Sequence, residues 1–197
     1  MTITTTQLQD HVGLRAPLRF AAVILLGFGL SYSLAGATLG RVLFPAAATG
    51  STIERGGQVI GSALVAQPFT DARYFQPRPS AASYDPMAAA GSNMARSNPD
   101  LRKRIAELTL AVAEREGIAP AQVPAELVTQ SGGGLDPHLS PGAAQVQVAR
   151  VAKARGIDVA TVERVLARHV EAPQFGVLGQ PRVNVLRLNL ALDALAR

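Results

Sequence analysis

The stretch TQSGGGLDPHLSP, residues 129–141, gathers residue types that bind anions or metals or act as nucleophiles. Its three consecutive glycines could offer backbone N–H groups to a phosphate, but the pattern G-x4-G-K-[ST] also needs a lysine, which is missing. The dinucleotide pattern G-x-G-x-x-G fails too, because its third glycine is missing. Since Pro141 removes one N–H donor and Ser140 competes as a helix cap, the residues favour a glycine-enabled turn over a phosphate site.

The same stretch supplies candidate metal ligands and a candidate nucleophile. Asp136 and His138 lie at i and i+2, but the other histidines of the chain are His11 and His169, so a set of three or four ligands is not in view. Ser131 or Ser140 with Asp136 and His138 has the residue types of a catalytic triad, but the G-x-S-x-G elbow is absent. We therefore expect no metal and no catalytic residue, and a secreted serine hydrolase is kept as an alternative.

The composition restricts the class of protein. The 197 residues suffice for one domain with an appendage. The net charge is +5, but the basic residues are dispersed and aromatic residues make up 5%, which disfavours nucleic-acid binding. The chain has no cysteine and therefore no disulfide or thiolate chemistry. Hydrophobic residues make up 48% and concentrate near the N-terminus, which favours a membrane segment.

Residues 20–40 carry no charge between Arg19 and Arg41. As a helix, this run of 21 residues would extend about 31 Å, close to the thickness of a bilayer core. A cleaved signal peptide is the alternative, because Arg15 and Arg19 form a positive n-region and the small residues 35–37 fit a cleavage site. The apolar run exceeds the usual signal core, so we expect a retained anchor in contact with the lipid bilayer.

The positive-inside rule predicts the orientation of this anchor, because Arg15 and Arg19 should stay in the cytoplasm. We expect a cytoplasmic N-terminus over 1–19, a transmembrane helix over 20–40, a linker over 41–57 and an extracytoplasmic domain over 58–197. The predicted fold class is α+β: a single N-terminal transmembrane helix followed by one small mixed α/β extracytoplasmic domain.

Start, stop and periodicity signals predict the elements of this domain. Asn98, Ser140 and Asp158 are cap residues, and Gly117 and Gly156 are typical helix ends. The signals predict short strands around a turn at Gly61-Ser62, helices over 99–116 and 141–155, a third helix between Asp158 and Pro173, and a strand over 182–188 that passes into helical spacing. The run 126–129 fits a strand or one turn of helix.

Several sequence blocks match a known family in order and spacing. They are GSALVAQPF (61–69), YFQPRPSA (74–81), AGSNMARSNPDL (90–101), VPAELVTQSGGGLDPHLSP (123–141), ARVAKAR (149–155) and LGQPRVNVLRLNLALD (178–193). With these blocks the chain resembles the C subunit of the Kdp potassium-transporting P-type ATPase over nearly its whole length from the membrane span onward. Two departures are mild: Met94 stands where leucine is usual, and GGG replaces G-S-G.

The resemblance implies an accessory subunit that is not an enzyme by itself. In that family the A subunit conducts the ion, the B subunit hydrolyses ATP and a small F subunit assists. The C subunit is needed for assembly and activity, and is described as a catalytic chaperone that raises the affinity of the B subunit for ATP. The residues proposed to touch nucleotide correspond to Ser131, Gly132, Gly133, Gly134 and Gln147. No intrinsic cofactor is implied, apart from this proposed contact with ATP.

The predicted orientation leads to a different hypothesis, because it puts residues 129–147 on the side of the membrane that lacks ATP. In that case the outer domain would contact the external face of the ion-conducting subunit through the loops 74–81 and 91–99. The alternative is a nucleotide-binding chaperone domain in the cytoplasm. In both cases the expected location is the bacterial inner membrane, which the chain crosses once.

Overall fold

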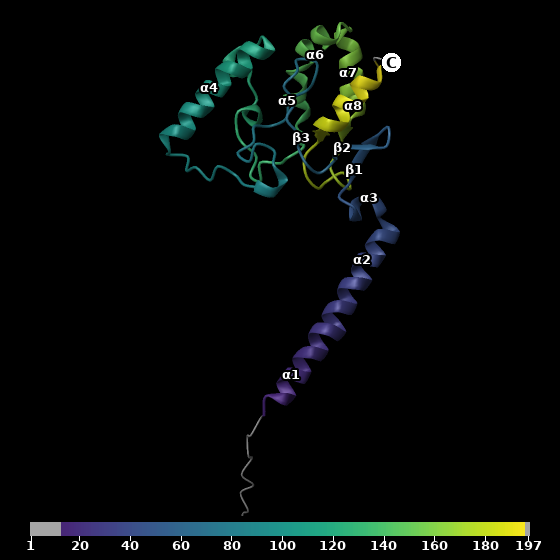
Figure 1. The fold of residues 1–197 in the computed structure, drawn as a ribbon. Helices are drawn as coiled ribbons and strands as arrows, with labels where there is room; N and C mark the ends of the chain where they lie inside the picture. Colours follow the sequence, from purple (N-terminus) through teal and green to yellow (C-terminus); the bar gives the residue numbers. More distant parts are fainter. Residues whose placement is uncertain (1–12, 196–197) are drawn as a thin grey trace, which may run out of the picture. The chain divides into compact units, whose positions relative to one another are not determined.

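The computed structural model describes residues 13–195, and the chain divides into two compact units, residues 1–50 and 51–197. A continuous helix from Arg15 to Leu43 forms most of the first unit and is the long rod in Figure 1. It consists of α1 (Arg15–Ala22), the π-helical η1 (Val23–Leu30) and α2 (Ser31–Leu43), and the short α3 (Pro45–Ala48) follows.

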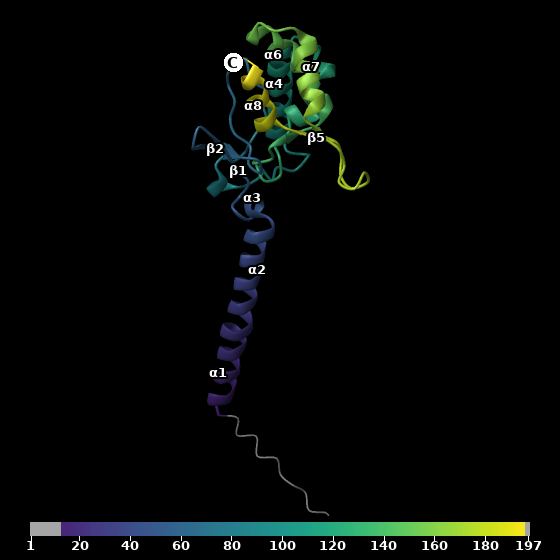
Figure 2. The same cartoon turned by 90° about the vertical axis from the view of Figure 1, so that its right-hand side faces the viewer.

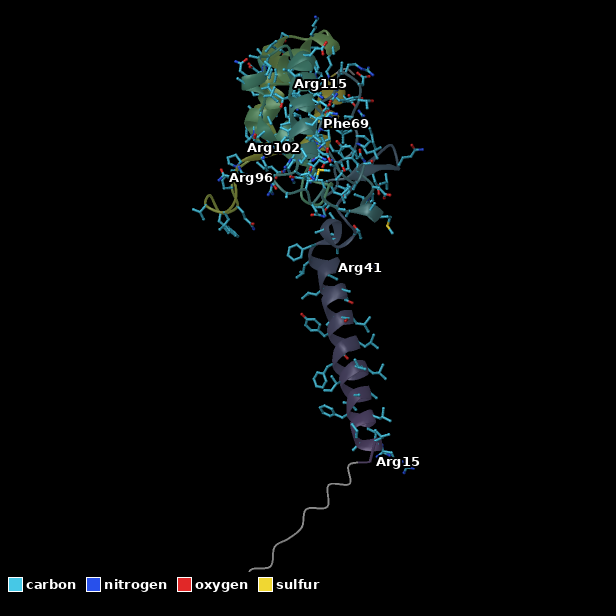
Figure 3. All side chains as sticks on the ribbon, turned by 90° about the vertical axis from the view of Figure 1, so that its left-hand side faces the viewer. Arg15, Arg41, Phe69, Arg96, Arg102 and Arg115 are labelled. Atoms are coloured by element: carbon cyan, nitrogen blue, oxygen red, sulfur yellow. The ribbon has the colours of Figure 1, made fainter. Side chains whose placement is uncertain are left out.

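This helix is long and apolar enough to cross a membrane, with 29 residues and a mean hydropathy of 1.8. The predicted span over 20–40 lies inside it. Arg15 and Arg41 lie near its two ends (Figure 3). The helix continues past the uncharged run because arginine is a good helix former. It ends before Pro45, because proline disfavours helical geometry in the preceding residue.

The second unit opens with an antiparallel hairpin of β1 (Thr52–Arg55) and β2 (Gln58–Ser62). The predicted linker over 41–57 is therefore too long, since its last residues form a strand. Gly56 and Gly57 have φ of +60° and +79°, the left-handed conformation that a two-residue hairpin turn requires. The predicted turn at Gly61 is wrong: this glycine lies in β2, where an added Cβ would come within 2.9 Å of the Leu186 side chain.

An irregular segment containing the 3-10 turn η2 (Pro86–Ala88) leads to helix α4 (Pro99–Glu116). The prediction of this helix is confirmed at both ends. Asn98 Oδ1 accepts a hydrogen bond of 2.8 Å from the Asp100 N–H, and Gly117 ends the helix with φ of +69°. Two further 3-10 turns follow, η3 (Pro120–Gln122) and η4 (Ala125–Leu127), so the run 126–129 forms a helical turn and not a strand.

The predicted helix over 141–155 is divided into α5 (Pro141–Gln145) and α6 (Val148–Arg155). The division has a local cause at Gln147. Its side-chain amide donates to the Ala143 carbonyl at 3.3 Å, while its backbone N–H bonds to Ala144 at 3.0 Å. The side chain thus takes the carbonyl that the helical N–H would use, which breaks the helix. The third helix is confirmed as α7 (Val159–Arg168), with Asp158 accepting from the Thr161 N–H at 2.7 Å.

A small antiparallel sheet has the strand order β3-β5-β4. Its strands are β3 (His138–Leu139), β4 (Val170–Glu171) and β5 (Arg182–Asn184), and helix α8 (Val185–Leu195) follows β5 directly. The predicted strand over 182–188 is therefore too long. Asn184 ends it, because its side-chain oxygen accepts from the Arg187 N–H at 3.1 Å and so caps the start of α8.

The core of the second unit lies where the helices meet this sheet. Helix α7 packs against both α6 and α8, and Figure 2 shows the three together. The completely buried apolar side chains at its centre include Phe75, Val151, Val162, Val183 and Leu188. The structure confirms a mixed α/β fold with one N-terminal helix of membrane-spanning length.

Candidate functional site

Ser131 to Gly134 form a tight turn, closed by a hydrogen bond of 3.2 Å from the Gly134 N–H to the Ser131 carbonyl. Gly134 has φ of +69°, and an added Cβ would lie 2.8 Å from the Ala90 carbonyl oxygen. The Ser80 hydroxyl donates to the Gly134 carbonyl at 2.6 Å. Ser131 and Gly134 are buried, whereas Gly132 and Gly133 are exposed. The glycines therefore let this turn lie against residues 80–90 while its tip stays open to solvent.

Asp136 follows the turn and is held by two neighbours. Its carboxylate pairs with Arg78 Nη1 at 3.2 Å and accepts from the His138 N–H at 3.0 Å. The pKa of Asp136 is lowered, first by the hydrogen bond with the His138 side chain and then by the His138 backbone N–H and the charge of Arg78. Partial burial acts in the opposite direction and raises it. Ser131 Oγ accepts from the Asp136 N–H at 3.4 Å. Asp136 thus lies between the serine and the histidine, whereas a catalytic triad needs the histidine there.

The N-terminus of α5 already receives a carboxylate from the protein itself. Ser140 Oγ accepts from the Ala143 N–H at 3.1 Å, which confirms the predicted cap. Glu126 accepts from the Ser140 N–H at 3.2 Å and also from its hydroxyl. A negative charge therefore occupies the place where a helix N-terminus would attract a phosphate. Glu126 lies in the block 123–141, but nothing in the sequence of that block indicated that its carboxylate would reach Ser140.

Gln147 is completely buried, and its amide uses all its hydrogen-bonding capacity inside the protein. Its oxygen accepts from the Gln76 N–H and from Arg150 Nη2, both at 2.9 Å. Its nitrogen donates to the carbonyls of Gln76 at 3.1 Å and Ala143 at 3.3 Å. In this arrangement Gln147 fixes the extended chain at Gln76 and presents no group to a ligand.

Asn189 of α8 holds the preceding residue in the same way. Its side chain accepts from the Phe75 N–H at 2.8 Å and donates to the Phe75 carbonyl at 2.9 Å. Two buried amides from two helices therefore clamp consecutive residues of one segment. A polar residue within the apolar run LNLAL of α8 was the signal for Asn189 that sequence reasoning missed.

A buried ion pair joins α4 to α6. The side chain of Glu116 is completely buried and accepts from Arg150 Nε at 2.8 Å and from Arg115 Nε at 2.6 Å. Arg150 also donates to the carbonyls of Ala72 at 2.6 Å and Tyr74 at 3.0 Å. Because every charge has partners, this network fixes the segment before Phe75 at low electrostatic cost.

The segment 74–84 connects the predicted site residues. Gln147 contacts it at Gln76, whereas the turn 131–134 contacts it at Pro79 and Ser80. The structure thus brings Ser131 to Gly134 together, and it places Gln147 at a different part of the same segment.

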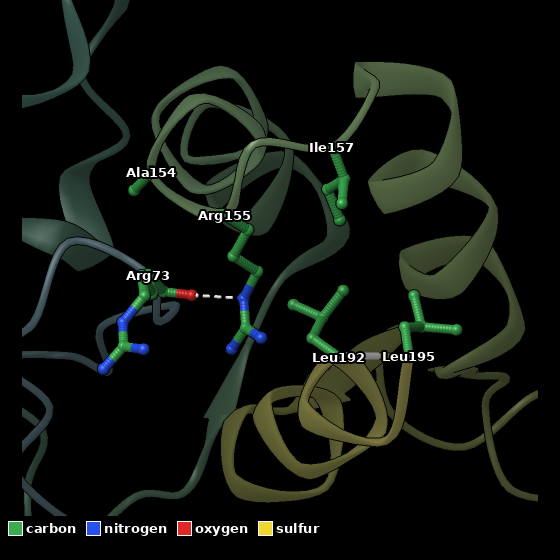
Figure 4. A pocket seen from close by; sticks show the side chains of 6 residues that line it. All are labelled: Arg73, Ala154, Arg155, Ile157, Leu192 and Leu195. Atoms are coloured by element: carbon green, nitrogen blue, oxygen red, sulfur yellow. Dashed lines mark hydrogen bonds between the residues drawn. The ribbon is translucent and has the colours of Figure 1, made fainter. Parts of the chain in front are cut away.

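A separate pocket of about 310 Å³ lies between α6 and α8 (Figure 4). It is lined by Arg73, Ala154, Arg155, Ile157, Leu192 and Leu195. Arg155 pairs with Asp193 at 3.0 Å and donates to the Arg73 carbonyl at 2.7 Å. Arg73 pairs with Asp71 at 2.8 Å. Both arginines thus have a carboxylate partner within the protein, and Arg155 shares Asp193 with Arg55, which lies 3.4 Å from it.

The described residues form a helix of membrane-spanning length and a small mixed α/β unit, whose polar residues serve mainly internal contacts. The family model described as "K+-transporting ATPase, c chain" matches residues 14–194. The chain belongs to this KdpC family.

Curated relatives carry the name "Potassium-transporting ATPase KdpC subunit". The protein from Xanthomonas campestris pv. campestris (strain B100) is 60% identical over 190 residues, which cover 96% of this chain and 91% of the relative. The protein from Shewanella putrefaciens (strain CN-32) is 48% identical over 196 residues, which cover 99% of this chain and 96% of the relative. The protein from Gemmatimonas aurantiaca is 50% identical and covers 93% of each. The chain is therefore a subunit of the potassium-transporting ATPase complex, with a role in potassium transport.

Proposed function

We propose that this chain is a non-catalytic accessory subunit that supports assembly and activity of the potassium pump. The observation that carries this proposal is the internal use of its reactive residues. Gln147 is completely buried and fully bonded, and the Glu116 carboxylate is enclosed by two arginines. Such a unit provides rigid surface loops on a stable core, which suits a protein that positions other proteins.

The proposed partners are the ion-conducting A subunit, the ATP-hydrolysing B subunit and the small F subunit, and the proposed place of residues 51–197 is outside the cytoplasm. The charges Arg15 and Arg19 before the apolar run support this orientation. A cysteine at the exposed Ala160 of α7 tests it, since the chain has no cysteine of its own. It should react with a membrane-impermeant maleimide in intact cells, whereas a control cysteine at Thr5 should react after lysis. The reverse pattern would place this unit in the cytoplasm.

The supporting role is tested in cells that lack this chain and depend on the pump for growth at low potassium. Restoring the wild-type chain should restore growth and potassium-stimulated ATP hydrolysis by the purified complex. The purified chain by itself should not hydrolyse ATP. A complex without this chain that keeps full activity would refute the proposal.

A catalytic chaperone that raises the affinity of the pump for ATP is the second candidate function. One observation favours it: Gly132 and Gly133 are exposed, and a Cβ added at either would meet no atom within 4 Å. A ligand could therefore approach this part of the backbone. If the glycine turn 131–134 contacts nucleotide, Gly132→Asp should raise the KM of the complex for ATP, because it adds a negative charge beside the phosphates. An unchanged KM would count against contact.

A further inference from the structure

The loop between β4 and β5 carries an exposed apolar tip. It connects Glu171 to Arg182, which pair across the two strands, and Figure 2 shows it projecting from the helices of its unit. At its end Phe175 is 83% exposed, Val177 79% and Leu178 59%. Three large apolar side chains exposed to water within four residues are unfavourable for an isolated protein, and exposed apolar residues grouped in this way are typical of an interaction site.

The tip has a fixed shape. The Gln174 N–H donates to the Leu178 carbonyl at 2.8 Å, and the Leu178 N–H donates back to the Gln174 carbonyl at 2.9 Å. Phe175 has φ of +55°, a left-handed conformation that is rare for an aromatic residue, and Gly176 follows with φ of +77°. The backbone at Phe175 is therefore strained in the way that is common at binding sites, and its side chain is exposed.

The base of the loop carries an excess of positive charge. Arg182 and Arg187 both approach Glu171, at 2.9 Å and 4.0 Å, so two guanidinium groups share one carboxylate. The exposed Arg168 lines the same shallow pocket as Glu171 and Arg187. A complementary surface would combine an apolar socket for the tip with acidic side chains around it.

We propose that the apolar tip, residues 174–178, docks into an apolar socket with an acidic rim on another protein subunit of the ATPase, with Phe175 as its anchor. A protein socket fits better than a lipid surface because the tip is preorganised. Fixing the shape of a loop reduces the ordering cost of binding to a shaped pocket, whereas a fluid bilayer imposes no such shape. The tip also lacks the Trp and Tyr that are enriched at membrane interfaces. This inference rests on the proposed accessory role and adds the surface that performs it.

Photo-crosslinking in the assembled pump identifies what the tip contacts. The full chain carries benzoyl-phenylalanine at position 175 and is expressed with the other ATPase subunits. A matched control carries the same probe at Leu110 of α4, which is 62% exposed. After irradiation of membranes, mass spectrometry should find adducts with an ATPase subunit from position 175 and not from position 110. An adduct with lipid, or no adduct at position 175, would overturn the proposal.

A substitution tests whether the contact matters for assembly. Phe175→Ser should reduce the amount of the other subunits that purify with the chain at least tenfold, while the melting temperature of the chain alone stays unchanged because the ring is exposed. Leu110→Ser should leave both unchanged. If the Phe175→Ser chain purifies with as much of the other subunits as the wild-type chain does, the docking proposal is wrong. The accessory role would still stand, because it fails only if the pump works without the chain.

Discussion

Replacing Glu116 with glutamine should destabilise the second unit far more than the same replacement at Glu107 on the same helix. Glu116 is enclosed by Arg115 and Arg150, at 2.6 Å and 2.8 Å. The glutamine oxygen can keep one of these hydrogen bonds, but its NH₂ group then faces the other guanidinium, donor against donor. Glu107 lies 4.0 Å from Lys103, and both of these side chains are largely exposed.

The two sites differ in their dielectric environment, and this sets the magnitudes. Removing one partner of a buried ion pair costs about 3–5 kcal/mol. Arg115 is 31% exposed, so water compensates part of its loss, whereas Arg150 is 10% exposed. We therefore expect about 3 kcal/mol for Glu116→Gln, the lower end of that range. At about 2–4 °C per kcal/mol, the melting temperature should fall by about 6–12 °C. An exposed i,i+4 pair contributes about 0.3–0.5 kcal/mol, so Glu107→Gln should lower it by less than about 2 °C.

Thermal unfolding of the full chain in detergent, followed by circular dichroism, measures this difference. The helix 15–43 should stay folded in the detergent and contribute a constant signal to all variants. The double variant Glu116→Gln/Arg150→Gln should be more stable than the sum of the two single effects predicts, because the second change removes the charge that the first left unpaired. Equal melting temperatures for the Glu116→Gln and Glu107→Gln variants would refute the reasoning.

Three further predictions concern the segment 74–84 and its contacts. Gly134→Ala should destabilise the unit by about 1–3 kcal/mol, because Gly134 has a left-handed conformation and no space for a Cβ. Gly133→Ala is the control, because a Cβ there meets open space, and urea titration compares the stability of the two variants. Asp136 has a lowered pKa in the folded state, so the stability it contributes is present above its ordinary pKa and is lost as the pH falls through the lowered value. The melting temperatures of wild type and Asp136→Asn should therefore differ at pH 7 and converge in strong acid, and a constant difference would contradict this. Asn189→Leu should cost about 2–6 kcal/mol, because it leaves the N–H and carbonyl of Phe75 buried without partners; a chemical denaturation midpoint equal to that of wild type would exclude the clamp.

The parts of the fold that sequence predicted well are those with local signals. Asn98 and Asp158 cap the helices α4 and α7, and Gly117 and Gly156 end α4 and α6, as expected. These signals act over three or four residues, so they are visible in sequence. The hairpin at residues 52–62 was missed because Gly61 resembles a turn residue, although it lies in β2, where the side chains of Gln67 and Leu186 leave no space for a Cβ.

The site residues depended on contacts between distant parts of the chain. Glu126 reaches Ser140 across 14 positions, and Gln147 reaches Gln76 across 71. No periodicity encodes such distances, because they follow from how the helices pack. The family resemblance pointed to Gln147 and the glycines, and whether these residues contact nucleotide stays a prediction.

The contacts of Gln147 restrict how it could influence nucleotide binding. Its amide is bonded to Gln76, and four residues later Ser80 holds the glycine turn through the Gly134 carbonyl. A substitution at Gln147 should therefore loosen the segment at Gln76 and displace the turn, which would change any property of the turn without direct contact between Gln147 and a ligand. Gly132 differs, because a side chain there meets open space and leaves the segment in place. An effect of Gly132 variants on ATP affinity thus reports contact, whereas the same effect of Gln147 variants is already explained by folding.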